Sequence, residues 1–211
     1  MGTVTDRKDK FLIVIGREYG SGGRRIGKML AKALGIAYYD KRLLSEAAAR
    51  MGYGANIFAE KDEKRPSAMR SLLSFCYGAP TANISDAPMS DEKLYECQSN
   101  VIRNLCESES CVIVGRTADY VMRDHPRLVS LFVHAPLEHR VKNIIRRGET
   151  DNEREAEQIA QRRDSARRDY YNYYTNRGSW GQASNYTLAF DASRIGDEAV
   201  VDIVKALLAK K

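Results

Sequence analysis

Residues 11–34 read FLIVIGREYGSGGRRIGKMLAKAL and decide the fold class of this chain. The run FLIVI at 11–15 is short, apolar and β-branched, which is typical of a buried parallel strand. The glycine-rich segment at 16–23 follows as a turn, and residues 24–34 have the apolar spacing of a helix that stops at Gly35. A buried strand that leads through a glycine turn into a helix is the opening of an α/β fold.

The rest of the chain continues this alternation. Further strands are predicted at 36–40, 111–114, 128–133 and 186–190, and further helices at 41–51, 91–107, 136–147, 153–175 and 196–209. Five short strands that alternate with helices predict one three-layer α/β/α domain around a five-stranded parallel sheet. We expect a flexible N-terminus at 1–10, a single domain at 11–211, and within it a mobile, partly helical insert at 52–90, where glycine and proline are frequent.

Composition excludes several classes of protein. The 211 residues carry 34 Lys+Arg against 28 Asp+Glu, a formal net charge of +6 with both signs mixed along the chain. The longest apolar runs, 11–15 and 111–114, are far shorter than a membrane span, and MGTVTDRKDK at the N-terminus lacks a signal core. We therefore expect a cytoplasmic protein without a membrane partner, whose positive charge suits small anionic ligands.

Cysteine and histidine spacing indicates no metal framework. The four cysteines form no C-x-x-C pair, and the three histidines have neither metalloprotease nor zinc-finger spacing. We expect reduced, mostly buried thiols at Cys76, Cys97, Cys106 and Cys111.

The glycine turn is a candidate phosphate cradle, because glycines let backbone N–H groups point inward at the start of a helix. The dinucleotide fingerprint G-x-G-x-x-G matches Gly20 and Gly22 but fails at Arg25, with Asp40 at the distance of a ribose-binding acid. The P-loop sequence G-x-x-x-x-G-K-[ST] also fits imperfectly: if Gly22 is its second glycine, Gly23 stands at the lysine and Arg17 at the first glycine. A plain tight turn is the alternative, which the crowding of Arg17, Arg24 and Arg25 disfavours unless an anion binds.

Three ordered motifs resemble the cytidylate kinase-like family of the P-loop nucleoside monophosphate kinases. They are IGREYGSGGRRIGKMLAKALGIAYYDKRLL (15–44), CVIVGRTADYVM (111–122), and RRDSARRDYYNYYTNRGSW (162–180) followed by NYTLAFDASRIG (185–196). The resemblance covers residues 11–205 and is weakest at 52–90. It implies a P-loop NTPase fold with a helical lid at 153–180 and an acceptor-side insert.

The resemblance also implies an activity, the ATP-dependent transfer of a phosphoryl group to a nucleoside monophosphate or a similar small molecule, with Mg²⁺. Its implied catalytic residues lie in the lid, and Asp40 and Arg116 would bind the acceptor. Where this chain has Gly23, Arg25 and Thr117, ordinary cytidylate kinases have Lys, Thr and Asp. The resemblance leaves the metal ligands unassigned, although Ser21 carries a hydroxyl. The implied catalytic residues are Arg163, Asp164 and Arg167; the implied nucleotide-binding residues are Arg17, Gly20, Ser21, Gly22, Gly23, Arg24 and Arg25.

Some of these residues have simpler interpretations. Asp40 is also well placed to cap the helix that begins at Lys41. The arginines of the lid could form a solvated, salt-bridged helix face, although Arg163 and Arg167 share one side at a spacing of four. The tyrosines of this helix could stack on a base, but core packing is expected for at least two of Tyr170, Tyr171, Tyr173 and Tyr174.

Other functions remain open. The departures at Gly23 and Arg25 favour a non-catalytic nucleotide-binding or sensing protein as the main alternative. An NAD-type oxidoreductase would not need the arginine-rich segment. Nucleic-acid binding is not expected, because residues 140–177 carry ten Lys/Arg against seven Asp/Glu, too balanced for a phosphate-backbone footprint.

Overall fold

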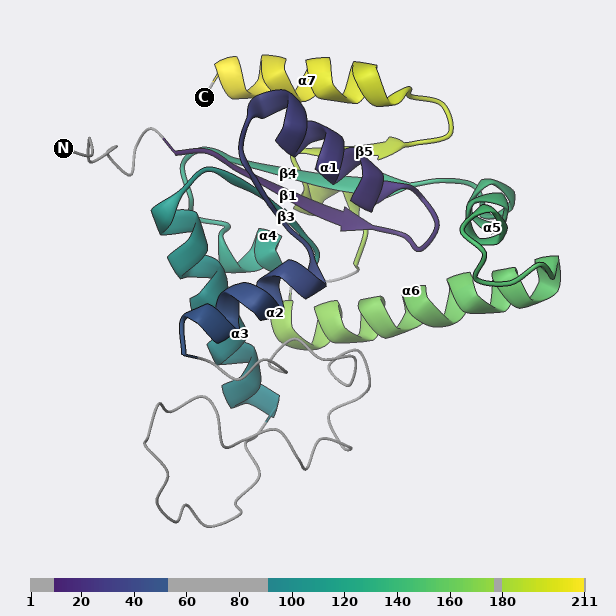
Figure 1. Cartoon of the computed structure of the whole chain (residues 1–211), viewed down its shortest axis with the longest axis horizontal. Coiled ribbons are helices and arrows are strands. Elements are labelled where there is room, and N and C mark those ends of the chain that lie inside the picture. The colour runs from purple at the N-terminus through teal and green to yellow at the C-terminus, as the bar shows by residue number, and fades with distance from the viewer. Residues whose placement is uncertain (1–9, 53–90, 177–179, 211) are drawn as a thin grey trace, which may run out of the picture.

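The computed structural model describes residues 10–52, 91–176 and 180–210. Its centre is a five-stranded parallel sheet with the strand order β2-β3-β1-β4-β5 (Figure 1). The strands are β1 (Leu12–Arg17), β2 (Ala37–Tyr39), β3 (Cys111–Val114), β4 (Leu128–His134) and β5 (Leu188–Asp191). The helices are α1 (Gly23–Leu34), α2 (Lys41–Arg50), α3 (Asp91–Ser108), α4 (Ala118–Val121), α5 (Leu137–Arg146), α6 (Glu153–Thr175) and α7 (Asp197–Ala209), with a 3-10 turn at Ala183–Asn185.

The central strand β1 is buried on both faces, as its unbroken apolar run predicts. Ile13 and Ile15 face one core with α1 and α7, and Leu12 and Val14 face a second core with α2, α3 and α4. Figure 1 shows α1 and α7 on one side of the sheet and α2, α3 and α4 on the other. The three-layer α/β/α architecture with a five-stranded parallel sheet is therefore confirmed.

Most predicted elements lie within two residues of the observed ones. The fifth strand begins at Leu188 rather than at residue 186, because Tyr186 N–H still donates to the carbonyl of Ala183 and closes the preceding turn. The four-residue helix α4 was not expected, since one turn is too short to show a helical period. The expectations for a flexible segment at 1–10 and a mobile insert at 52–90 concern residues that lie almost wholly outside the described ones.

Two further findings concern the cysteine thiols and the length of the helices. Cys106 and Cys111 are buried free thiols and Cys97 is a half-buried one, as predicted, while Cys76 lies outside the described residues. Among the described helices, none combines the length and the apolar composition that crossing a membrane requires.

The order of connections opens a crevice at the carboxyl edge of the sheet. The chain leaves β1 toward α1 on one face, whereas it leaves the neighbouring strand β3 toward α4 on the opposite face. In open parallel sheets, ligands bind at such a switch point. Helices α5 and α6 pack on each other through Val141, Ile144, Ala156 and Ala160 and lie near this same edge (Figure 1).

Candidate functional site

The glycine loop lies at the end of β1 and has the backbone geometry of an anion cradle. Gly20 and Gly22 have φ values of 83° and 93°, which favour glycine. Helix α1 starts at Gly23, and its N-cap residue Gly22 makes no side-chain capping bond. The first N–H groups of α1 therefore face out of the helix, where an anion is favoured.

Helices α5 and α6 hold this loop from outside. Asn143 Nδ2 donates to the carbonyl of Gly20 at 2.8 Å, and Asp164 Oδ1 accepts the N–H of Tyr19 at 2.7 Å. Arg140 is buried and donates through Nη1 to Asp164 Oδ2 at 2.6 Å. The loop is thus fixed to two helices by hydrogen bonds to its own backbone.

The loop serine faces its own backbone. Ser21 is buried, and its Oγ donates to the carbonyl of Glu18 at 2.9 Å. Arg25, at the other position where the family carries a hydroxyl, has no oxygen to offer a metal. The described residues also contain no cluster of three or more His, Cys, Asp or Glu side chains that could hold an ion. The loop itself therefore does not fit a protein-bound magnesium site.

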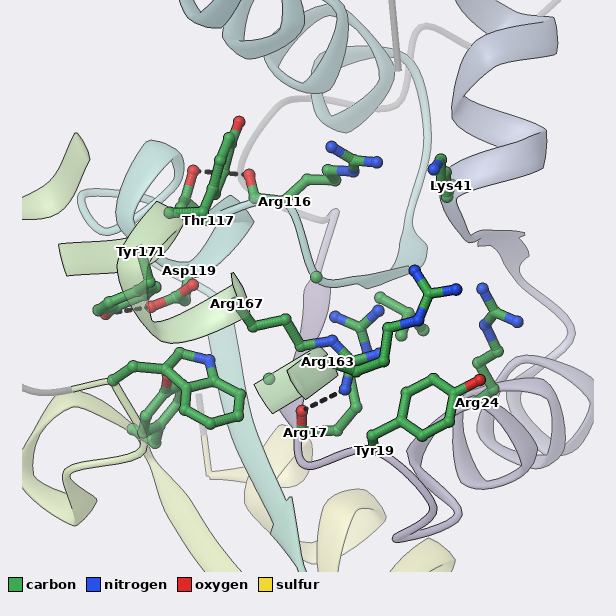
Figure 2. Close-up of a pocket in the computed structure, with 16 residues that line it drawn as sticks. Arg17, Tyr19, Arg24, Lys41, Arg116, Thr117, Asp119, Arg163, Arg167 and Tyr171 are labelled. Carbon is green, nitrogen blue, oxygen red and sulfur yellow. Dashed lines mark hydrogen bonds between the residues drawn. The ribbon is translucent and has the colours of Figure 1, made fainter. Parts of the chain in front are cut away.

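A first cavity, which we call the strand-edge cavity, lies at the carboxyl ends of β1 and β3 and has a volume of about 190 Å³. Figure 2 shows basic side chains converging on it from β1, α1, α2, α6 and the turn after β3. Among the described residues, Asp119 is the one acidic side chain in its lining. A negatively charged ligand is therefore favoured there. The basic side chains are Arg17, Arg24, Lys41, Arg116, Arg163 and Arg167.

A second cavity, the loop cavity, lies along the glycine loop and α5 and has a volume of about 290 Å³. Gly20, Gly22 and Gly23 line it, together with Arg25. It meets the strand-edge cavity, since both linings contain Arg17, Tyr19, Arg24 and Arg167 among the described residues. The remaining residues of its lining are Glu18, Asn143, Arg146 and Arg147.

The turn after β3 brings Arg116 into the strand-edge cavity. Gly115, Arg116 and Thr117 have successive φ values of 85°, 60° and 52°, an uncommon left-handed run for two non-glycine residues. Thr117 is buried, and its Oγ1 donates to the carbonyl of Arg116 at 2.6 Å and lies 3.0 Å from the hydroxyl of Tyr95. These contacts hold the turn that presents Arg116 at the strand end.

Three arginines, two of them on α6, gather around one aromatic ring. The guanidinium carbons of Arg167 and Arg163 lie 5.0 Å and 6.0 Å from the ring centre of Tyr19, and that of Arg147 lies 5.1 Å from it. The face of an aromatic ring attracts cations, so Tyr19 offsets part of their mutual repulsion. Arg167, 13% exposed, donates to the carbonyl of Arg17 at 3.3 Å and lies 3.4 Å from Asp164 Oδ1.

The carboxylate of Asp164 is buried among these groups and does not line either cavity. Burial raises the pKa of Asp164 above its ordinary value, while the Tyr19 N–H, Arg167 and Arg140 act to lower it. Its contacts make it a positioning residue for the loop and for Arg167.

The inner wall of the strand-edge cavity carries a buried polar pair. Tyr171 donates to Asp119 Oδ2 at 2.8 Å, and both residues are about 95% buried. Burial, followed by the neighbouring charge of Asp119, raises the pKa of Tyr171 well above its usual range. Trp180, which the sequence left unassigned, also lines this cavity and packs edge-on against Phe132 with 5.3 Å between ring centres.

Core packing was expected for at least two of the four tyrosines of α6, and it is found for the buried Tyr171 and for Tyr174. Tyr174 stacks on Tyr95 with 4.1 Å between ring centres, whereas Tyr173 is 55% exposed. Tyr170 lines the strand-edge cavity and donates to Gln98 Oε1 at 2.9 Å.

Asp40 has the capping role that the sequence suggested, and its carboxylate lies outside the cavity. The Asp40 carboxylate accepts the N–H groups of Arg42 and Leu43 at 3.1 Å and 3.2 Å and caps α2, and it does not line the cavity. Lys41 lines it instead. Sequence reasoning missed Lys41, Tyr19, Asp119, Arg140, Asn143, Arg146 and Arg147; the adjacent pair Arg146-Arg147 at a helix end was the one available signal.

The sequence matches a known protein family. The model of the cytidylate kinase-like family matches residues 12–194. A protein of Methanosarcina barkeri named cytidylate kinase is 24% identical over 190 residues, which are 90% of this chain and 91% of that protein.

Two solved structures share the fold. One is an uncharacterised protein from Eubacterium ventriosum, with a TM-score of 0.71 and 24% identity over 96% of this chain and all of that one. A shikimate kinase from Bacteroides thetaiotaomicron has a TM-score of 0.53 and 15% identity over 94% of this chain and 98% of its own. The fold is that of the P-loop kinases, and the chain belongs to the cytidylate kinase-like family.

Proposed function

We propose that this protein transfers the γ-phosphoryl group of ATP to a nucleoside monophosphate. The observation that carries the proposal is the meeting of two basic cavities at the glycine loop. Transfer between two nucleotides needs one site for each and a shared wall where the phosphoryl group passes. The loop cavity suits the donor, because its lining includes the glycine loop beside the start of α1. The strand-edge cavity suits the acceptor.

The proposed transfer neither takes up nor releases a proton. An oxygen of the acceptor phosphate forms a bond to the γ-phosphorus as the bond from that phosphorus to its β,γ-bridging oxygen breaks. The electron pair of that bond leaves with ADP, and the acceptor becomes a diphosphate. Such a transition state spreads charge over the transferred oxygens, and positioned cations stabilise it. Arg163 and Arg167 on α6 supply these cations in our proposal, with residues 153–180 acting as a lid.

The acceptor is bound in this proposal by cations at the strand edge. Arg116 and Lys41 reach the strand-edge cavity from the turn after β3 and from the start of α2 (Figure 2). Neither lines the loop cavity, so their charges serve the acceptor rather than the donor. The name of the Methanosarcina relative supports a cytidine monophosphate acceptor.

Magnesium enters this proposal with the nucleotide. Kinases bind it through phosphate oxygens, waters and one or two protein groups. Since Ser21 Oγ donates within the loop and Arg25 has no oxygen to coordinate a metal, a magnesium ion would be held by the donor phosphates and water. None of the roles assigned here depends on a protein ligand to it.

A non-catalytic nucleotide sensor is the second candidate. Gly23 and Arg25 favour it, because they replace the lysine and threonine of ordinary cytidylate kinases. Such a protein would use the same arginines to clamp a nucleotide without transferring phosphate.

A single transfer assay separates the two. The purified protein is incubated with [γ-³²P]ATP, MgCl₂ and each nucleoside monophosphate, and the products are separated by thin-layer chromatography. We expect a labelled diphosphate with at least one acceptor, and the same product from the Arg103→Ala variant, since Arg103 is exposed on α3 and lines neither cavity. ATP binding by calorimetry without any labelled diphosphate would favour the sensor instead.

A further inference from the structure

Two of the departures from the P-loop sequence lie against each other in space. In the pattern G-x-x-x-x-G-K-[ST], Arg17 stands at the first glycine and Gly23 at the lysine. A Cβ atom added at Gly23 would lie 2.8 Å from Cβ and 3.1 Å from Cγ of Arg17. The first distance is shorter than real Cβ contacts allow. A side chain at residue 23 therefore competes with the stem of Arg17 for one space.

A second glycine accommodates the other end of the same side chain. A Cβ atom added at Gly115, after β3, would lie 3.0 Å from Cζ of Arg17 and closer still to its Nη1. Gly115 also has a φ of 85°. The Arg17 side chain thus runs through a slot between Gly23 and Gly115, from the end of β1 toward the end of β3.

The slot ends where the two cavities meet. Arg17 lines both of them, and its carbonyl accepts a hydrogen bond from Arg167, which also lines both. Among the described residues, Arg24 is the other cation common to the two linings. Arg24 is largely exposed, whereas Arg17 is partly buried in the slot. Arg17 and Arg167 are therefore the positioned cations at the junction, and of the two Arg17 is the one that belongs to the P-loop sequence itself.

We infer that Arg17 replaces the missing loop lysine as the cation that contacts the transferred phosphoryl group. The inference rests on the proposed phosphoryl transfer and assigns one of its catalytic residues. The P-loop pattern carries its positive charge on a lysine at the start of α1, whereas this chain carries it on Arg17 at the end of β1. A guanidinium donates two parallel hydrogen bonds to phosphate oxygens, which suits this contact. The close contact explains why residue 23 carries no side chain while the Arg17 side chain occupies this space.

The first test removes the charge and keeps the stem. Arg17→Gln is compared with the wild type and with Arg103→Ala in the transfer assay. Calorimetry then measures the affinity for ATP and for AMP, an adenine nucleotide that lacks the β- and γ-phosphates. We expect turnover to fall roughly 10³-fold, the low end for a phosphoryl-contacting arginine. ATP affinity should fall roughly 10- to 100-fold, as for a lost charged hydrogen bond, and AMP affinity far less.

The second test moves the charge back. In Arg17→Gly/Gly23→Lys the lysine occupies the space that the Arg17 stem leaves. We expect this double variant to exceed Arg17→Gly in turnover by at least tenfold. Gly23→Lys alone should be less stable than the wild type in thermal denaturation, because its Cβ meets the Arg17 stem. The double variant should recover that stability.

The outcomes decide the inference separately from the proposed function. Turnover of Arg17→Gln within threefold of the wild type overturns it, as does a folded double variant no more active than Arg17→Gly. If Arg17→Gln does not fold, the double variant alone decides. If the wild type transfers to no acceptor, the proposed function fails, and calorimetry still decides the contact: equal losses for ATP and AMP overturn it, and selective loss of ATP supports it.

Discussion

The backbone N–H of Tyr19 donates to the carboxylate of Asp164 at 2.7 Å, although the two residues are 145 positions apart. Through this bond, helix α6 is fixed to the glycine loop at the sheet edge. The other carboxylate oxygen accepts from Arg140 on α5 at 2.6 Å. One buried carboxylate therefore sets the position of the loop relative to both helices.

Asp164→Asn should destabilise the protein and loosen the loop. The amide removes the charge that Arg140 and Arg167 share and replaces one acceptor oxygen with a donor. Hydrogen bonds to charged groups contribute about 1.5–3 kcal/mol each, and we expect a loss in this range in urea unfolding. Asp169→Asn, on an exposed residue of the same helix, should stay within about 0.5 kcal/mol of the wild type. Equal stability of the two variants would contradict the assigned role.

Gly20→Ala should separate the loop from α5. The new Cβ would lie 2.7 Å from the carbonyl oxygen of Arg140, and the φ of 83° is itself unfavourable for alanine. Gly35→Ala is a matched control, because Gly35 has a φ of 65° and nothing within 4 Å of its Cβ position. The control should lower the free energy of unfolding by about 1–2 kcal/mol, the cost of placing alanine in the left-handed backbone region. Gly20→Ala should lower it clearly more. A smaller loss for Gly20→Ala in thermal or urea unfolding would refute the close contact.

Arg116→Ala and Arg25→Ala should affect different ligands. Arg116 lines the strand-edge cavity and Arg25 the loop cavity, and neither lines both. We expect Arg116→Ala to weaken binding of the acceptor monophosphate and Arg25→Ala to weaken binding of ATP, each by roughly tenfold or more. Calorimetric titration of each ligand alone measures this. Equal losses for donor and acceptor in Arg116→Ala would show that the two cavities are not assigned correctly.

Arg167→Ala should lower turnover far more than affinity. Its side chain lies where the cavities meet, beside Arg17 and over the ring of Tyr19. Arginines that follow the charge of a transferred phosphoryl group contribute roughly 10³–10⁵ in rate, and one that shares the task should lie at or below the low end. Arg162→Ala, an exposed neighbour that lines neither cavity, is the control and should keep full turnover. Parallel losses of affinity and turnover in Arg167→Ala would indicate a clamp rather than a transfer residue.

Nucleotide phosphates should occupy the loop at residues 17–25. Crystals soaked with millimolar ATP should show phosphate oxygens against the N–H groups of Gly22 and Gly23, because these begin α1 without a side-chain cap. Phosphates bound elsewhere, with this loop empty, would end the assignment of the donor site.

Local patterns in the sequence were sufficient for the framework. The apolar run before Gly16 predicted a central strand buried on both faces, and the glycines after it predicted the turn into α1, because strand burial and positive φ are properties of a few adjacent residues. Asp40 as a helix cap was predicted in the same way, since the cap bonds lie two and three residues ahead. Arg116 at the exit of β3 also followed from its place after a buried strand.

Only the tertiary structure decided which side chains meet. The slot for Arg17 depends on Gly115, which lies beside it because β3 pairs with β1, and no sequence spacing shows that pairing. The family resemblance implied a catalytic role for Asp164, but the structure shows its carboxylate accepting hydrogen bonds from Tyr19 and Arg140 of two other segments. Lys41 rather than Asp40 lines the cavity, because the cap bonds turn the carboxylate toward α2. Contacts between distant segments depend on how layers pack, and packing is a property of the whole chain.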